Sequence, residues 1–421
     1  MGRGWGSAAS SLLDRTRGGG ASSSLHREQF VEIRGTCLGG EMGRTVAARV
    51  AETQIPVRGG AVVLSGLLSV LAPVLLPGQA TRPCAIEIRP VVLLGANDDT
   101  ISAFEFPTIA NDREGRYFVS PDASRGRVMV FDSKGQLRRL LGRVGDGPGE
   151  YRWAESVRPQ SDGGLHVVDP IAGRLSVYDA GLRLREARRL LRGLHDAWSG
   201  PGDSIVGLGF AMGRQSIGLP LHVLASDGTV ARSFGNARSA TLFTPESEVR
   251  AARHAALAPD STFWLAPFHE YRLEQWSFDG RRISSRVIPS DWFESWFRRP
   301  RDREDMARPV TEVAGIHVDN AGLVWVFSSV PENDWRPDAK AMLRRGTETG
   351  ILDRVQRDRY VDAVVEIVDP RTGVVRAHQR FGRSLLPVRG DEPLAFGWRA
   401  TDRGGSVPEV FRLTPLCSVP K

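Results

Sequence analysis

The sequence predicts an all-β fold: a six-bladed β-propeller of four-stranded antiparallel blades that occupies residues 85–421. Three observations predict it: a strand-and-turn pattern repeats at a nearly constant interval, Gly and Asp stand at the turns, and six outer strands can be counted. The composition agrees, because 421 residues with 41% hydrophobic and 25% charged side chains are typical of a globular chain with a large core.

The clearest repeat lies between residues 122 and 179. Asp122–Asp132 aligns with Asp169–Asp179, which begins 47 residues later, and both segments contain a turn, an alternating strand and a second turn opened by an aspartate. An aspartate at that position can hydrogen-bond to its own backbone. The following strand repeats at the same interval, in residues 91–95 and 138–142. Because these aspartates recur with the blades, we interpret them as turn residues and not as catalytic carboxylates.

The repeat also predicts how the ring closes. Outer strands are expected near residues 91–95, 137–142, 183–191, 230–235, 282–288 and 375–381. The first of them precedes the first complete blade, and the C-terminal stretch has too few strands for a blade of its own. We therefore predict that Ile86–Leu94 pairs with Glu409–Leu413, which removes two sheet edges that would otherwise invite aggregation. This pairing would bring Cys84 near Cys417, and a disulfide between them would fit an oxidising compartment.

The first 80 residues differ from the rest in composition. Residues 1–41 are rich in Gly, Ser and Arg without a hydrophobic period, which indicates a disordered segment or an over-extended gene start. Residues 42–80 hold arginines, then the apolar run Ala61–Leu76, then small residues, which is the order of a secretory signal peptide. The run is short for the span of about 20 residues that crosses a bilayer, so an uncleaved anchor is the lesser alternative. The mature chain is expected in the periplasm or outside the cell, without a transmembrane span.

The net charge of +7 does not indicate nucleic-acid binding. Only Lys134, Lys340 and Lys421 are lysines, so the basic residues are nearly all arginines, and they are spread along the chain among acidic residues. A nucleic-acid site needs a concentrated basic face. We expect no nucleic-acid partner, and we expect the mature chain to be a monomer.

The segment from Phe131 to Tyr151 resembles the NHL-like six-bladed propeller proteins that are common among exported bacterial proteins. Its most specific part is Gly145–Glu150, read Gly-Asp-Gly-Pro-Gly-Glu and followed by an aromatic residue. The resemblance runs with decreasing clarity from Val91 to Thr414. It implies that residues 145–150 link the outer strand of one blade to the inner strand of the next. The same glycines could suggest a phosphate loop, but the Lys-Ser/Thr ending and the following helix of such loops are missing.

Aromatic residues interrupt the repeat in residues 289–312. Trp292, Phe293, Trp296 and Phe297 stand at helical spacing and are followed by a charged run. We weigh two interpretations, a docking surface for a partner and the packing of a small helix against the ring. A second helix is expected near Lys340–Arg345.

Three histidines are the sequence's candidates for a metal site. His195, His254 and His317 fall near the start of the inner strands of successive blades, and inner strands line a propeller's central channel. Together they could hold a divalent metal, with Glu248 or Glu312 as an oxygen ligand. The alternative is three ordinary hydrogen-bonded histidines. No Gly-x-Ser-x-Gly, Cys-x-x-Cys or His-Glu-x-x-His motif is present, and no other cofactor is predicted.

Three functional classes remain open. A binding or scaffolding module for a peptide, glycan or partner protein at one face of the ring is favoured, because it requires only the ring and its loops. A metal-dependent hydrolase or lyase of the lactonase-like propeller kind, with its site at the central channel, is the alternative. The third class is a structural role in a cell-surface assembly. The NHL-like family mostly has no established activity, so the resemblance implies a fold and no particular chemistry.

Overall fold

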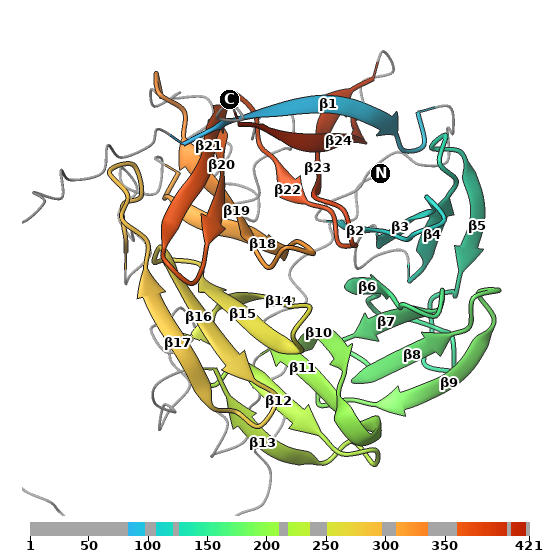
Figure 1. The fold of residues 1–421 in the computed structure, drawn as a ribbon. Helices are drawn as coiled ribbons and strands as arrows, with labels where there is room; N and C mark the ends of the chain where they lie inside the picture. Colours follow the sequence, from blue (N-terminus) through green and yellow to red (C-terminus); the bar gives the residue numbers. More distant parts are fainter. Residues whose placement is uncertain are drawn as a thin grey trace, which may run out of the picture. The chain divides into compact units, whose positions relative to one another are not determined.

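The computed structural model describes residues 83–96, 107–120, 126–209, 218–235, 251–296, 309–335, 360–401 and 406–417. They form six antiparallel four-stranded sheets that are arranged as blades in a ring (Figure 1). This is the predicted β-propeller. Several predictions lie outside the described residues: the disordered segment 1–41, the signal peptide 42–80, Asp122, Glu248, Phe297 and the helix near Lys340–Arg345. No helix in the described part of the chain is long and apolar enough to cross a membrane.

Five blades are each built from four consecutive strands, with the first strand at the centre of the ring and the fourth at its rim (Figure 1). Blades 1 and 2 comprise β2 (Thr108–Asn111), β3 (Tyr117–Ser120), β4 (Val128–Phe131), β5 (Leu137–Leu141), β6 (Ser156–Pro159), β7 (Leu165–Asp169), β8 (Arg174–Tyr178) and β9 (Leu184–Arg189). Blades 3 and 4 comprise β10 (Leu194–Ser199), β11 (Ile205–Gly209), β12 (Leu221–Leu224), β13 (Val230–Phe234), β14 (Arg253–Leu257), β15 (Thr262–Pro267), β16 (Arg272–Ser277) and β17 (Arg282–Val287). Blade 5 comprises β18 (Glu312–Val318), β19 (Val324–Pro331), β20 (Val361–Asp369) and β21 (Val374–Phe381).

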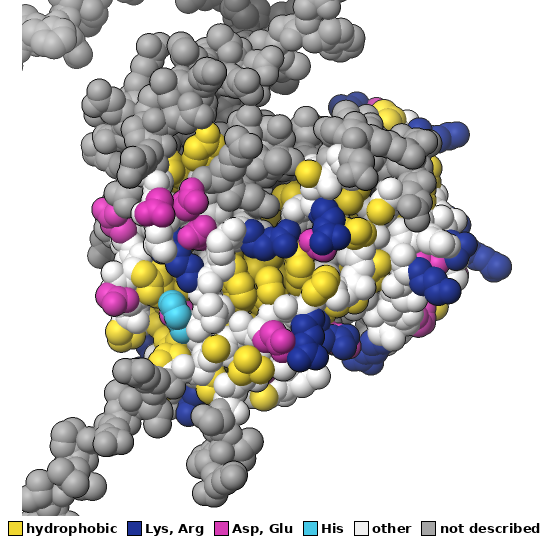
Figure 2. Space-filling model, turned by 90° about the horizontal axis from the view of Figure 1, so that it is seen from above, with side chains coloured by type: hydrophobic (Ala, Val, Ile, Leu, Met, Phe, Trp, Pro, Cys, Tyr) yellow, Lys and Arg dark blue, Asp and Glu magenta, His cyan; other side chains and the backbone are white. Residues whose placement is uncertain are grey.

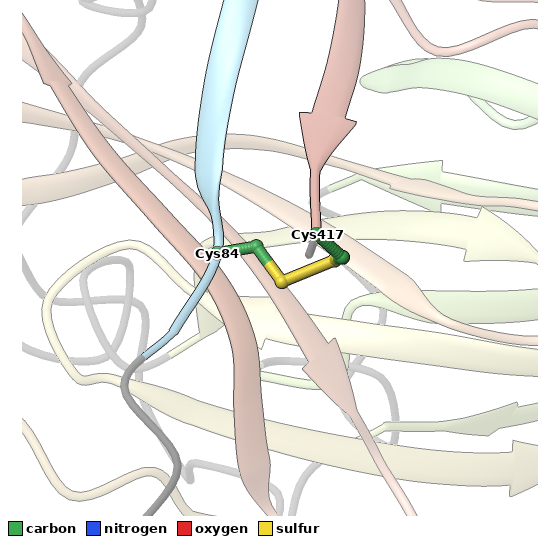
Figure 3. Close-up of a disulfide and its surroundings, with 2 residues drawn as sticks. All are labelled: Cys84 and Cys417. Atoms are coloured by element: carbon green, nitrogen blue, oxygen red, sulfur yellow. A yellow bond between two sulfur atoms is a disulfide. The ribbon is translucent and has the colours of Figure 1, made fainter. Parts of the chain in front are cut away.

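Blade 6 combines the two ends of the described chain. Its strands are β22 (Leu386–Pro387), β23 (Leu394–Ala400), β24 (Ser406–Leu416) and, at the rim, β1 (Ala85–Leu93). β1 and β24 are antiparallel, with Ile86 opposite Pro415 and Leu93 opposite Glu409. Directly beyond the paired strands, Cys84 and Cys417 are joined by a disulfide with their Cα atoms 4.8 Å apart (Figure 3). The strands and cysteines thus meet where the repeat predicted.

The turn aspartates have the structural role that their repetition indicated. One carboxylate oxygen of Asp132 accepts hydrogen bonds from the backbone N–H groups of Lys134 and Gln136, both at 2.9 Å. Asp169 and Asp179 accept from backbone N–H groups of their own turns in the same way. Gly135 completes the first of these turns with a φ of +74°, a value that L side chains rarely adopt. Local hydrogen bonding therefore fixes the turns between strands.

The hydrophobic core is divided among the interfaces between neighbouring blades. The described residues form six buried clusters, and each cluster joins two adjacent blades. Ile109 of blade 1 packs with Phe396 of blade 6, and Phe327 of blade 5 packs with Phe411 of blade 6. Central strands such as β3 and β7 are buried throughout, whereas the rim strand β17 is mostly exposed. Because every blade covers a face of the next, the ring holds the inner strands at fixed positions around the axis.

The Gly-Asp-Gly-Pro-Gly-Glu segment is a turn between β5 and β6, as the resemblance implied. The Glu150 carboxylate accepts a hydrogen bond from the Gly147 N–H at 2.8 Å and forms an ion pair with Arg143 at 2.5 Å. Gly142 has a φ of +79°, and a Cβ there would collide with the buried ring of Tyr151. The hydrogen bond and the ion pair of Glu150 both lie within residues 142–150, so the glycines here shape a turn and not a phosphate loop.

The surface carries arginines and acids side by side. On the face drawn in Figure 2, Lys and Arg side chains lie among Asp and Glu side chains and form no continuous basic surface among the described residues. Exposed ion pairs join Arg113 to Asp391 at 2.6 Å and Arg412 to Glu392 at 2.8 Å. Pairs of this kind contribute little to stability, because water and salt screen them.

Candidate functional site

The six innermost strands surround a cavity of about 940 Å³ in the middle of the ring. Residues from β2, β6, β10, β14, β18 and β22 all contribute to its wall. His195 on β10, His254 on β14 and His317 on β18 line this one cavity, although they come from three different blades. The volume is within the range of small-molecule sites. The inner-strand placement expected for the histidines therefore brings them to a common space.

All three imidazoles are neutral at pH 7. Burial lowers the pKa of His195 and of His317 to about 4, and that of His254 to about 3. His254 stacks on the ring of Phe268 with centroids 4.2 Å apart, and its Nε2–H donates to the Val313 carbonyl oxygen at 3.1 Å. A neutral imidazole has one donor and one acceptor nitrogen. The wall can therefore exchange hydrogen bonds with a polar ligand without adding charge.

The histidines do not form a metal-coordinating set. Within the described ranges, no group of three or more His, Cys, Asp or Glu side chains is placed to hold a metal ion. The Nε2 of His254 is engaged by a carbonyl, and Glu312 does not line the cavity. His254 matches the alternative of a hydrogen-bonded histidine.

A buried carboxylate between two arginines is the most polar feature of the cavity wall. Asp196 on β10 is 2% exposed and accepts hydrogen bonds from the Ser156 hydroxyl at 2.8 Å and from the Arg158 guanidinium at 2.6 Å. The Arg389 guanidinium lies 3.2 Å from the same carboxylate. Burial by itself raises the pKa of Asp196, but Arg158 and Arg389 more than offset it and leave the pKa at about 2. Asp196 is therefore ionised at every physiological pH.

Arg389 is held in place by three other blades. Its backbone N–H donates to the carbonyl of Ile109 at 2.9 Å, and its carbonyl accepts from the N–H of Asn111 at 2.7 Å, which fixes it to β2 of blade 1. Its side chain donates to the Ser156 hydroxyl of blade 2 and pairs with Asp196 of blade 3. A side chain fixed in this way is preorganised, because little further ordering is needed when it binds a ligand.

Asp196, Arg158 and Arg389 together form the Asp196 cluster, which carries a net positive charge. Part of this cluster is accessible from the cavity. Two guanidinium groups share one carboxylate, and the Arg389 side chain remains 28% exposed. The other guanidinium, of Arg158, lies over the ring of Trp198 at 4.4 Å from its centroid, which leaves it less free to move. Arg389 is thus the more exposed of these two guanidinium groups and lines the cavity.

Glu155 adds a carboxyl group to the same wall. It is half-buried, lines the cavity, and its side chain forms no hydrogen bond or ion pair with the described residues. Burial raises the pKa of Glu155 to about 7; Arg389 acts against this rise, whereas Asp196 and Asp169 add to it. Glu155 can therefore gain or lose a proton near neutral pH, as a general acid or base must.

Sequence reasoning did not single out Asp196, Arg389 or Glu155. A signal existed for Asp196, since this acid stands beside His195 among the apolar residues Leu194, Ala197 and Trp198 of an inner strand. No comparable signal existed for Arg389, because its partners on β6 and β10 are far away in the sequence. Only the closed ring places them together.

The aromatic segment is not a helix in its described part, so the helical prediction is wrong for residues 289–296. The Ser290 hydroxyl accepts hydrogen bonds from the backbone N–H groups of Trp292 and Phe293, at 3.3 and 3.0 Å, which forms a turn. Phe293 stacks on Tyr271 with centroids 5.3 Å apart, and Trp296 donates its indole N–H to the Thr311 carbonyl at 2.7 Å. Trp292, Phe293 and Trp296 thus pack against the blades and remain partly exposed. The docking surface that the sequence offered as an alternative stays a prediction.

A buried carboxylate fastens this segment to blade 5. Glu366 accepts hydrogen bonds from the Tyr271 hydroxyl, from the Trp292 indole N–H at 3.1 Å and from the His378 Nδ1 at 2.7 Å. The hydrogen bond and the charge of Glu366 raise the pKa of His378 above its ordinary value, and Asp291 adds to the rise. The ion pair is thus present at mildly acidic pH.

We expect this ion pair to make stability depend on pH. Because the pKa of His378 is raised in the folded state, its contribution is complete below the unfolded pKa of about 6.5 and is lost as pH rises through the folded value. The free energy of unfolding of wild type and His378→Gln, measured in urea from pH 5.5 to 9, should differ most at the acidic end. A difference that stays constant across this range would contradict the assignment.

No protein-family model matches the chain, and no curated protein matches it. Among solved structures, a member of the DUF4221 family from Bacteroides vulgatus is similar with a TM-score of 0.54 and 9% identity, over 79% of this chain and 100% of that chain. Virginiamycin B lyase from Staphylococcus aureus is similar with a TM-score of 0.41 and 11% identity, over 77% of this chain and 99% of that chain. A gluconolactonase from Xanthomonas campestris has a TM-score of 0.40 and 13% identity, over 74% and 88%. At 9% identity the likeness to the DUF4221 member shows a shared fold alone.

Proposed function

We propose that the chain is the ligand-binding module of an exported protein and that its ligand site is the central cavity. The observation that carries this proposal is Arg389, a partly exposed cation whose backbone and side chain are fixed by three neighbouring blades. Sites that bind specifically keep their polar groups in place before the ligand arrives. Export rests on the signal-like order of residues 42–80.

The cavity suits a small polar ligand such as a short glycan or peptide. Its volume of about 940 Å³ accommodates a molecule of that size, and neutral imidazoles on three blades can donate to and accept from hydroxyl or amide groups. A whole partner protein could contact only the mouth of this cavity.

Blocking the mouth of the cavity tests where the ligand binds. Ser199 and Asn320 line the cavity and are exposed, so Ser199→Trp and Asn320→Trp should fill its entrance without disturbing the core. In a thermal-shift screen of glycans and short peptides, compounds that stabilise wild type should fail to stabilise these variants, since binding to the folded state raises its stability by mass action. Val287→Trp, on the exposed rim strand β17, is the matched control and should respond as wild type does. Equal stabilisation of all variants would place the site elsewhere.

A hydrolase or lyase with its site in the same cavity is the second candidate, and the pKa of Glu155 favours it. A carboxyl group with a pKa of about 7 can carry a proton to or from a substrate at neutral pH. The metal-dependent form of this candidate has no support from the described histidines, which do not form a coordinating set. Incubating each compound that binds with wild type and with Glu155→Gln, followed by mass spectrometry, tests the enzyme: turnover by wild type alone favours it, and an unchanged compound favours the binding module.

A further inference from the structure

We propose that the central cavity takes a ligand with a free carboxylate, that Arg389 binds this carboxylate, and that Glu155 takes up one proton as the ligand binds. This inference rests on the proposed function, because it assigns a ligand class to the same site. It concerns two groups that face one space: a fixed cation and a carboxyl group without a hydrogen-bond partner among the described residues.

Arg389 has the geometry of a carboxylate receptor. A guanidinium has five N–H donors in a planar fork, and described residues engage it only through Ser156 and Asp196. The remaining donors and the 28% exposed side chain leave room for a second carboxylate. Arginine binds carboxylates through two parallel hydrogen bonds, which neutral hydroxyl groups do not match.

The charges of Arg158, Asp196 and Arg389 fit one negative charge on the ligand. Arg158 and Arg389 together carry two positive charges and Asp196 carries one negative charge, so the cluster has a surplus of one positive charge. The imidazoles of His195 and His254 are neutral at pH 7 and do not change this sum. A monocarboxylate would neutralise the cluster, which is the favourable arrangement for charges that are largely removed from water.

Glu155 is the group that responds to this neutralisation. The charged groups that act on it are Arg389, Asp196 and Asp169, and of these only Arg389 favours its ionised form. A ligand carboxylate on Arg389 would cancel that cation and add a negative charge close to Glu155. Like charges disfavour ionisation, so the protonated form of Glu155 becomes the stable one. Binding therefore consumes a proton when the pH is near or above the free pKa of Glu155.

The coupling predicts weaker binding in alkaline solution. If each binding event takes up one proton, affinity falls about tenfold for each pH unit above the pKa of Glu155 in the free protein. In Glu155→Gln this pH dependence should disappear, and affinity at pH 8.5 should exceed that of wild type.

Isothermal titration calorimetry with defined probes tests the proposal. D-galacturonate and N-acetyl-alanyl-alanine supply carboxylates from a sugar and from a peptide, and D-galacturonate methyl ester and N-acetyl-alanyl-alanine amide are their uncharged counterparts. We expect at least one carboxylate to bind at least tenfold more tightly than its counterpart. Its heat of binding at pH 7.5 should differ between phosphate and Tris buffers by the uptake of most of one proton, because Glu155 with a pKa of about 7 is mostly ionised there. Arg389→Gln should lose the preference, Arg389→Lys should keep part of it, and Arg412→Gln, which removes an exposed cation at the surface, should bind as wild type.

The coupling between Glu155 and Arg389 can also be measured without a ligand. In protein labelled with 13C at the glutamate carboxyl groups, the signal that Glu155→Gln removes reports the titration of Glu155. Its midpoint should move to higher pH in Arg389→Gln, and an unmoved midpoint overturns the coupling.

Binding of a carboxylate probe without proton uptake overturns the inference but leaves the ligand-binding function standing. Failure of both carboxylates to bind while another compound enters the cavity overturns the ligand class, and failure of every compound to respond to mouth-blocking variants overturns the proposed function itself.

Discussion

Asp196→Asn should lower the free energy of unfolding by about 3–5 kcal/mol, the loss seen when one partner of a buried ion pair is removed. The substitution leaves Arg158 and Arg389 facing each other without the carboxylate that lies between them. It also places an amide, which donates hydrogen bonds from one end, against two guanidinium groups that only donate. Urea denaturation followed by tryptophan fluorescence at pH 7 measures the effect, since Trp198 lies beside the cluster.

Asp391→Asn is the matched control for this prediction. Asp391 lines the same cavity and pairs with Arg113 at 2.6 Å, but both side chains are more than half exposed. Water and salt screen an exposed pair, so this variant should remain close to wild type. Equal losses in the two variants would mean that burial of Asp196 has no part in stabilising the ring.

Local patterns in the sequence predicted the blades closely. The outer strand expected near residues 282–288 is β17 (Arg282–Val287), and the one expected near 230–235 is β13 (Val230–Phe234). Such strands are predictable because the turns that bound them use short-range chemistry. Asp132 binds the backbone of its own turn, and Gly135 adopts a φ that few other residues tolerate. The count of repeats then predicts the ring without any knowledge of distant contacts.

The aromatic segment shows where local patterns fail. Trp292, Phe293 and Trp296 stand at helical spacing, yet their partners are Tyr271, Glu366 and Thr311, which belong to other segments of blades 4 and 5. Tyr271 and Glu366 hold Trp292 and Phe293 in one cluster, and Thr311 holds Trp296. Tertiary contacts of this kind override a local helical preference, and a single sequence does not reveal them.

The candidate site was predictable only in part, for the same reason. Inner strands face the channel in any propeller, so the period that located β10, β14 and β18 also placed their histidines on the cavity wall. The charges of Arg158, Asp196 and Arg389 come from three blades, and the chemistry of the site arises from their contact. Burial decides the state of each group, because it makes the imidazoles neutral and holds Glu155 near its midpoint at pH 7. Burial is a property of the closed ring and is not encoded in any one segment.

Removing the Cys84–Cys417 disulfide should also have a large effect on stability. The bond joins residues 333 apart in sequence, so in the unfolded chain it closes a very long loop. In the chain-entropy treatment such a crosslink stabilises the folded state by restricting the unfolded one, and loss of a native disulfide typically costs about 2–5 kcal/mol. We expect a loss of this size in urea for Cys84→Ser, for Cys417→Ser and for the double variant alike, because each removes the same bond.

Backbone contacts should keep the rim strand in place when the disulfide is absent. The Cys84 N–H donates to the Arg376 carbonyl at 2.8 Å, the Cys84 carbonyl accepts from the His378 N–H at 2.8 Å, and β1 is paired with β24 over most of its length. The double serine variant should therefore fold and retain the β-sheet signal in circular dichroism, with a lower midpoint. Dithiothreitol should destabilise wild type and leave the double variant unchanged. Two results would contradict the disulfide: dithiothreitol leaves the stability of wild type unchanged, or a thiol-specific label reacts with Cys84 and Cys417 in the folded protein. Either result would show that strand pairing alone joins the ends of the ring.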